Sequence, residues 1–143
     1  MKQSMDFFGN ALYEYYKGDR SPFFIILPTG EKDYGDLSRY FRTYIHLSRL
    51  EKKLISLSKG KILDIGCATG YYIPALNKKG NVLGIDISRQ AIKVAKENGL
   101  TNCKTADIFK FRTNKKFETI TLLENNLGID DDQWLAYIGR GCM

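Results

Sequence analysis

The sequence predicts an α/β fold in which a parallel sheet is flanked by helices. From residue 61 onward, short apolar segments alternate with segments of helical pattern, as in strand–helix–strand units whose strands run parallel. Three of the apolar segments end in an aspartate, at Asp64, Asp86 and Asp107. The chain has 143 residues, of which 43% are hydrophobic, and this is sufficient for one domain with a core of its own.

The sheet is expected within residues 59–143, and its strands are short apolar runs with flanking turn residues. Those strands are 61–65, 81–86, 101–106 and 117–123. A short helix is expected between the first two strands, with Pro74 near its first turn and Gly80 placed to end it. A second helix, from Arg89 to Asn98, begins after the cap residue Ser88. A further short helix is expected at 133–138, after an acidic run.

Residues 1–58 are expected to form a helical N-terminal lid or substrate segment. Aromatic and aliphatic residues at near-helical spacing predict a helix that ends at the breaker 17–22. The apolar run 23–27 predicts a strand, and the stretch around Tyr34 is its expected partner. Residues 36–57 predict a helix, broken near Thr43, in which one face carries four leucines: Leu47, Leu50, Leu54 and Leu57.

Composition and charge disfavour several classes of protein. The net charge of +6 suggests nucleic-acid binding, but the basic residues are scattered pairs beside acids, which is typical of solvated surface. The three cysteines have no CxxC spacing, so we expect reduced thiols and neither a metal site nor a disulfide framework. No apolar run approaches the roughly 20 residues of a membrane span, and no secretory signal is visible. A cytoplasmic protein without membrane contact is expected.

A turn of small residues follows the first strand and predicts a nucleoside-binding site. Gly66, Ala68 and Gly70 keep side chains away from a ligand that approaches the backbone. Asp86 follows Asp64 by 22 residues, close to the offset of about 20 at which an acid meets ribose hydroxyls in such units. Because a carboxylate can accept hydrogen bonds from both hydroxyls of a cis-diol, this residue is the expected ribose ligand.

The turn differs from the G-x-G-x-x-G fingerprint of dinucleotide-binding proteins. The last required glycine would fall on Tyr71, whereas the glycine stands at Gly70. Asp64 would also lie near a pyrophosphate, where its charge is unfavourable. Both features disfavour a nicotinamide dehydrogenase and favour a cationic or zwitterionic ligand.

The segments 62–70, 84–88 and 106–109 together resemble the class I S-adenosylmethionine-dependent methyltransferases. The family's first motif, D-x-G-x-[GA]-x-G, is matched by Asp64, Gly66, Ala68 and Gly70, and the resemblance extends over about residues 36–129. It implies a Rossmann-like sheet and S-adenosyl-L-methionine as the cofactor.

The resemblance also implies a role for each matching residue. The turn, including Cys67, would hold the methionine portion, and Asp86 would bind the ribose hydroxyls. Asp107 and the backbone of Ile108 would bind the adenine, while Ile87 would line its pocket. Leu123, at the end of the fourth strand, would lie beside the transferred methyl.

The family's sheet has seven strands, and this sequence ends soon after the fourth. We therefore expect the C-terminal strands to be missing, either because the chain is part of a longer protein or because it is a natural truncation. The fourth strand would then be an open edge at which Ile120, Leu122 and Leu123 meet water or a second copy of the chain. If the chain is a natural truncation, we expect two copies to form a homodimer along this edge.

The expected activity is methyl transfer to a small molecule. The acid-or-Asn-Pro-Pro-aromatic signature of nucleic-acid amino-methyltransferases does not occur at 124–127. The alternatives are an RNA methyltransferase, suggested by the positive charge, and a non-catalytic S-adenosylmethionine-binding or interaction module. No catalytic base is assigned, and His46 is expected to be structural or exposed. Four residues could line an acceptor site or simply pack within a lid: Tyr13, Tyr16, Tyr40 and Glu124.

Overall fold

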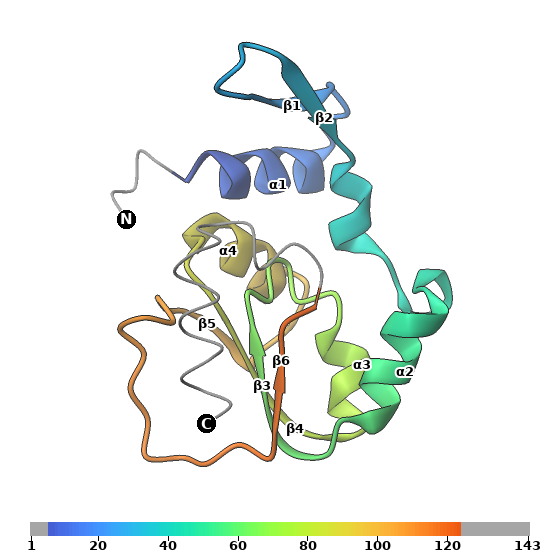
Figure 1. Cartoon of the computed structure of the whole chain (residues 1–143), viewed down its shortest axis with the longest axis vertical. Coiled ribbons are helices and arrows are strands. Elements are labelled where there is room, and N and C mark those ends of the chain that lie inside the picture. Colours follow the sequence, from blue (N-terminus) through green and yellow to red (C-terminus); the bar gives the residue numbers. More distant parts are fainter. Residues whose placement is uncertain (1–5, 124–143) are drawn as a thin grey trace.

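A computed structural model of the protein describes residues 6–123 and contains a four-stranded parallel sheet (Figure 1). Its strands, in the order β5-β4-β3-β6, are β5 (Cys103–Thr105), β4 (Gly80–Asp86), β3 (Gly60–Ile65) and β6 (Thr119–Thr121). Leu63 is in register with Leu83 on one side and with Ile120 on the other. The predicted α/β fold class with a parallel sheet is confirmed, and the aspartates gather at the carboxyl edge of the sheet.

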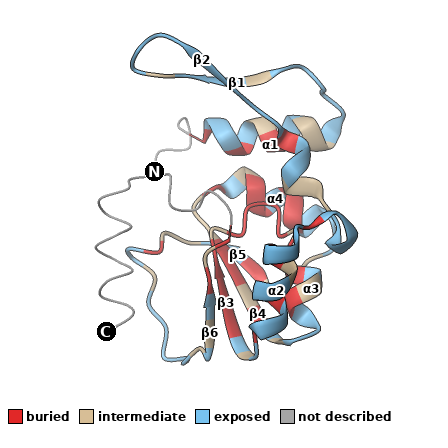
Figure 2. Ribbon diagram, turned by 45° about the vertical axis from the view of Figure 1, so that its right-hand side comes forward, coloured by how far each residue is buried: buried red, intermediate tan, exposed pale blue. Residues whose placement is uncertain are grey.

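The two faces of the sheet carry separate core clusters because strand side chains alternate. Ile62 lies in the cluster that the helices cover, together with residues of α3 (Ile73–Asn77) and α4 (Arg89–Glu97). Leu63 lies on the opposite face, where Ile108 packs against it. Figure 2 shows this buried layer running along β3 and β4 beneath α4.

The N-terminal segment lies over α4. In α1 (Phe7–Lys17), Leu12 is fully buried and packs with Ala91 of α4. The chain continues into an antiparallel hairpin of β1 (Phe23–Ile26) and β2 (Lys32–Gly35), which extends from the rest of the fold and is largely exposed (Figure 2). The predicted first helix and the predicted pairing of the two short strands are confirmed.

The helix expected over residues 36–57 is instead three short helices. They are the 3₁₀ helices η2 (Leu37–Phe41) and η3 (Tyr44–His46) and the α-helix α2 (Arg49–Leu57). The break near Thr43 is confirmed, and a second break occurs at Ser48, whose capping box with Glu51 starts α2. Leu50, Leu54 and Leu57 are exposed, and α2 buries Glu51 and Ile55 instead.

The helix between β3 and β4 is also shorter than expected. Gly80 does not end it, because α3 stops at Asn77 and Gly80 is already the first residue of β4. The helix predicted at 133–138 lies outside the described residues. None of the helices between residues 6 and 123 is long and apolar enough to span a membrane.

The fourth expected strand is only three residues long, as β6. Among the described strands, β6 pairs with β3 alone, and Ile120 is 54% exposed as an edge residue would be. Leu123 was expected at the open edge, and this is wrong because the residue is buried in the core cluster under the helices. Association of a second copy along β6 stays a prediction.

Candidate functional site

The turn after β3 adopts the backbone conformation that its small residues predict. Gly66, Ala68 and Gly70 have φ angles of 69°, 50° and 78°, in the left-handed region that glycine tolerates best. The amides of Gly66 and Cys67 donate to the carbonyl of Ile85, at 2.8 and 3.0 Å. These bonds fasten the turn to the carboxyl end of β4, beside Asp86.

Asp86 joins the turn to the start of α4. Its Oδ2 accepts from the amide of Ala68 at 2.8 Å, and its Oδ1 accepts from the amide of Ser88 at 2.8 Å. Burial raises the pKa of Asp86. The hydrogen bonds from the Ser88 and Ala68 amides lower the pKa, and the negative charge of the nearby Asp6 raises it further. Since each carboxylate oxygen has two acceptor positions, each can accept one further hydrogen bond, as a ribose diol would require.

Asp64 is the most deeply buried acid at this edge, with 1% of its surface exposed. Its Oδ1 accepts from the hydroxyl of Thr121 at 2.7 Å, but its Oδ2 makes no hydrogen bond within residues 6–123. Burial raises the pKa of Asp64 to about 7, and the charge of Asp86 acts in the same direction. A buried acceptor with no donor is costly, so this oxygen is suited to a cation or donor that a ligand brings.

The remaining predicted residues surround these two acids in different ways. Asp107 is half-buried beyond β5 and accepts from the amide of Phe109 at 3.0 Å, while Ile87 is half-exposed after β4. Cys67, Ile108 and Leu123 are buried in the core clusters. Any contact of Cys67 or Ile108 with a ligand would therefore use their backbone groups.

Burial raises the pKa of both thiols within residues 6–123, Cys67 and Cys103. Burial raises the pKa of the Cys67 thiol well above its ordinary value, and the charges of Asp64 and Asp86 add to this. A thiol with a raised pKa is a poor nucleophile and metal ligand. Cys67 and Cys103 are free cysteines, and Cys142 lies outside the described residues.

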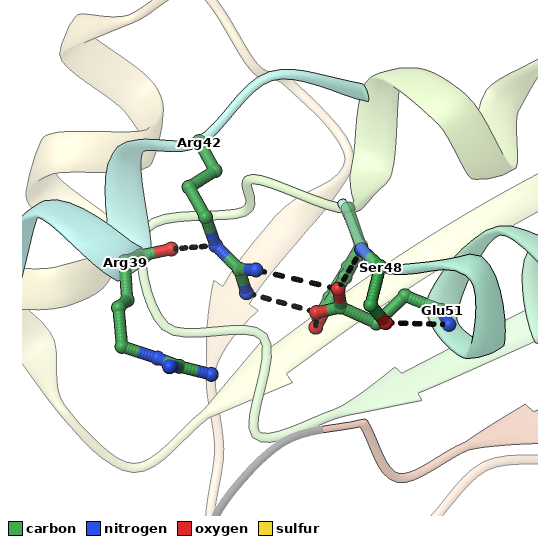
Figure 3. Close-up of polar contacts among 5 residues, drawn as sticks. Arg39, Arg42, Ser48 and Glu51 are labelled. Atoms are coloured by element: carbon green, nitrogen blue, oxygen red, sulfur yellow. Dashed lines mark hydrogen bonds and ion pairs between the residues drawn. The ribbon is translucent and has the colours of Figure 1, made fainter. Parts of the chain in front are cut away.

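A second polar cluster joins the residue after η2, the first turn of α2 and the start of α3, and the sequence did not indicate that these residues would meet (Figure 3). Glu51 accepts from Arg42 Nη2 at 2.8 Å and from the Ser48 amide at 2.6 Å. The hydroxyl of Tyr72 also donates to Glu51. Burial alone would raise the pKa of Glu51, but the hydrogen bonds from Tyr72, Ser48 and Arg42 outweigh it and lower the pKa to about 2. We call Arg42, Ser48, Glu51 and Tyr72 the Glu51 cluster.

Arg42 of the Glu51 cluster lines a surface cavity of about 510 Å³, which extends to Pro74 and Ala75 of α3. Thr69 and Gly70 of the turn form part of its wall, whereas none of the three edge aspartates lines it. The cavity is therefore separate from the acidic edge. The motif S-x-x-E at 48–51, a capping box, is the sequence signal that could have indicated Glu51.

The tyrosines proposed as acceptor-site residues are engaged in packing or surface contacts. The ring of Tyr40 lies edge-on to Phe8 and Tyr71, with centroids 5.1 and 6.0 Å apart. The hydroxyl of Tyr13 donates to Glu97 at 3.4 Å. These contacts favour the packing interpretation for Tyr13, whereas Tyr40 both packs against other rings and lines the cavity; Glu124 lies outside the described residues.

Comparison with known proteins places this fold and turn in a wider group. Residues 56–133 match the family model described as a methyltransferase domain. The chain is 27% identical over 117 residues to a proposed ribosomal RNA large subunit methyltransferase of Methanocaldococcus jannaschii, covering 78% of this chain and 30% of that protein. It is 34% identical over 92 residues to the ubiquinone biosynthesis O-methyltransferase of Actinobacillus pleuropneumoniae, and this match covers 56% of this chain and 39% of that protein.

A solved structure of similar fold is that of a SAM-dependent methyltransferase from Bacteroides fragilis in complex with S-adenosyl-L-homocysteine. The TM-score is 0.73 at 26% sequence identity, and the match covers 88% of this chain and 53% of that one. The chain thus spans about half the length of this structural relative, and it spans 30% and 39% of the two curated relatives.

Proposed function

This chain belongs to the methyltransferase domain family, and from that premise we propose that it binds S-adenosyl-L-methionine at the carboxyl edge of its sheet and serves in methyl transfer. The observation that carries the proposal is the pair of acids at this edge. Asp86 holds the turn with an acceptor position left on each oxygen, and Asp64, near the end of β3, has a buried oxygen with no hydrogen-bond partner within residues 6–123.

The residues at the edge fit the parts of this cofactor. The diol of the ribose would donate to Asp86, and the positively charged methionine portion would lie at the turn, near Asp64. Asp107 and the backbone of Ile108 stand beyond the next strand, where the adenine would bind. When bound, the cofactor supplies a methyl group on a sulfonium, which passes to a nucleophilic atom of the acceptor and leaves S-adenosyl-L-homocysteine.

The charge of the site favours a cationic ligand over a phosphate. Burial raises the pKa values of Asp64 and Asp86 in the free protein; repulsion from Asp86 adds to the rise at Asp64, and repulsion from Asp6 adds to the rise at Asp86. A cation that enters the edge relieves the repulsion and restores the ionised form of Asp64. A pyrophosphate would add negative charge at the same place, and the turn does not follow the dinucleotide fingerprint.

Calorimetric titration with S-adenosyl-L-homocysteine tests the proposal without knowledge of the acceptor. We expect binding by the wild-type chain and at least tenfold weaker binding by Asp86→Asn, because the amide group cannot accept at both positions. Asp33→Asn, which changes an exposed acid of the hairpin, is the matched control and should bind as the wild type does. Absence of binding by the folded wild-type chain would contradict the proposal.

We propose a small molecule as the methyl acceptor. The 34% identity to the ubiquinone biosynthesis O-methyltransferase supports this class. The identity of 27% over most of the chain to the proposed ribosomal RNA methyltransferase, together with the net charge of +6, supports RNA as the second candidate. Transfer of labelled methyl from the cofactor into small-molecule or RNA fractions of a cell extract separates the two, and transfer that ribonuclease abolishes would favour RNA. No transfer into any fraction would favour a binding module without catalysis.

A further inference from the structure

The carboxylate of Asp6 connects the first turn of α1 to the first turn of α4. It is buried, with 6% of its surface exposed, and caps α1 by accepting from the Gly9 amide at 3.1 Å. Its other oxygen accepts from the Ser88 hydroxyl at 3.0 Å and from the Gln90 amide at 3.1 Å. One side chain therefore receives three hydrogen bonds from two helices that are more than 80 residues apart in sequence.

Gly9 makes this close approach possible. A Cβ atom placed on Gly9 would lie 2.0 Å from the Ser88 hydroxyl oxygen and 2.3 Å from an oxygen of Asp6. Contacts this short do not occur between real atoms, so any larger residue would separate the two helices. Neither Asp6 nor Gly9 stands out in the sequence, although an aspartate before an aromatic helix is a typical N-cap.

Ser88 carries the connection from Asp6 to the proposed ribose ligand. Its hydroxyl donates to Asp6 and accepts from the Ala91 amide at 3.0 Å, while its own amide donates to Asp86 at 2.8 Å. Asp86 in turn accepts from the Ala68 amide of the turn. A continuous series of hydrogen bonds thus runs from α1 through Ser88 and Asp86 to the turn after β3.

We propose that Asp6 is a positioning residue for the cofactor, because by fixing Ser88 it sets the orientation of the Asp86 carboxylate. Packing of α1 against α4 and binding of the cofactor are therefore cooperative. The inference rests on the proposed function. It adds to that function a link between the N-terminal segment and the cofactor site.

The chemistry of the contact supports a positioning role rather than simple capping. An asparagine could still cap α1 through its carbonyl oxygen, but its amide group could not accept from Gln90. Asp6 also lies near enough to contribute to the raised pKa of Asp86, so the fold tolerates two neighbouring carboxylates here. Ser88 alone would cap α4, and the contact with Asp6 is an addition that fixes its rotamer.

A double-mutant cycle on S-adenosyl-L-homocysteine affinity tests the proposal. We expect Asp6→Asn to weaken binding about five- to tenfold in the wild-type background, and less than twofold when Asp86→Asn is already present. Asp36→Asn is the matched control, because Asp36 also caps a helix of the N-terminal segment, where its side chain accepts from the amide and hydroxyl of Ser38. We expect this control to leave the affinity unchanged.

Gly9→Ala provides a second route if Asp6→Asn folds poorly, since the added methyl group separates α1 from Ser88 while Asp6 remains. It should weaken binding to a similar extent. Equal losses from Asp6→Asn with and without Asp86→Asn would overturn the proposal, as would wild-type affinity in both folded variants. Failure of the wild-type chain to bind would instead contradict the proposed function, so the two failures are distinguishable.

Hydrogen exchange supplies a readout that a purely structural contact would not affect. Because coupling between two sites is reciprocal, the ligand should slow exchange of the α1 amides, including that of Gly9, by about the factor that Asp6→Asn costs in affinity. In Asp6→Asn the ligand should no longer slow it. Exchange in α1 that does not respond to the ligand in the wild type would also overturn the proposal.

Discussion

Asp64 and Glu51 are both buried acids, at 1% and 6% exposure, and they show opposite uses of a buried carboxylate. Glu51 accepts from Arg42, Ser48 and Tyr72, and its pKa is lowered to about 2. Within residues 6–123, Asp64 accepts from Thr121 alone, and its pKa is raised to about 7. The first carboxylate is satisfied within the fold, whereas the second keeps an oxygen available for a group from outside.

The two acids affect the stability of the fold in opposite directions. A fully hydrogen-bonded ion pair holds η2, α2 and α3 together, whereas an acid with an unfilled acceptor weakens the free protein at neutral pH. Acids with strongly raised pKa values are typical of functional sites, and hydrogen-bonded ion pairs are typical of structural ones.

The largest expected effect follows from Glu51→Gln. The change leaves the Arg42 guanidinium beside a neutral group, and we expect the free energy of unfolding to fall by about 3 kcal/mol. Urea denaturation measures it, with the exposed Glu14→Gln as control. The affinity for S-adenosyl-L-homocysteine should change less than threefold; loss of affinity without loss of stability would reverse the roles of the two acids.

Asp64→Asn should have the opposite effect on stability. The amide carbonyl still accepts from Thr121, and the cost of a buried charge disappears, so the free energy of unfolding at pH 7.5 should rise by about 2 kcal/mol. The affinity for S-adenosyl-L-homocysteine should fall at least tenfold. A variant that is less stable and binds normally would mean that Asp64 is a structural residue.

The pH dependence of stability should separate the two acids. The pKa of Glu51 is lowered in the fold, so its contribution is present above about pH 4.5 and is lost as the pH falls towards 2. The pKa of Asp64 is raised, so stability is lost as the pH increases from about 4 to 7. Urea denaturation from pH 2.5 to 8 should show both limbs. Glu51→Gln should reduce the loss of stability below about pH 4.5, and Asp64→Asn should reduce the loss between about pH 4 and 7.

The smallest expected effect is that of Thr121→Val, which removes the one hydrogen-bond donor to the Asp64 carboxylate among the described residues. At pH 7.5 the free energy of unfolding should fall by about 1 kcal/mol, and at pH 5, where Asp64 holds its proton, the loss should be smaller. Thermal unfolding at the two pH values measures the difference. An equal loss at both would show that the hydroxyl matters for packing and not for the charge.

The sequence was sufficient to predict the parts of the molecule that depend on local pattern. The small residues at 66–70 could be placed in a turn, and the offset from Asp64 to Asp86 put both acids at one edge of the sheet. These features depend on short segments whose backbone conformation the residues themselves restrict.

The capping box at 48–51 could have indicated Glu51, but the cluster as a whole could not be predicted, because Arg42 and Tyr72 come from other elements and the apolar pattern of α2 is misleading. The leucines of α2 have the spacing of a buried face, yet Leu50, Leu54 and Leu57 are exposed and Glu51 is buried. Apolar periodicity assigns a glutamate to solvent unless its partners are known, and Arg42 and Tyr72 are 9 and 21 residues away. Asp6 escaped notice for the same reason, since Ser88 is 82 residues distant.

The claim that Asp64, unlike Glu51, keeps an oxygen available for a ligand is tested most directly by the pKa of Asp64. The carboxyl ¹³C chemical shift measures it with and without S-adenosyl-L-homocysteine. We expect a pKa near 7 in the free protein and a decrease of at least two units when the ligand binds. The carboxyl signal of Asp64 is assigned as the one that Asp64→Asn lacks. Such a decrease would mean that the ligand supplies the missing partner. An ordinary pKa in the free protein, or a raised one that the bound ligand does not change, would contradict the account.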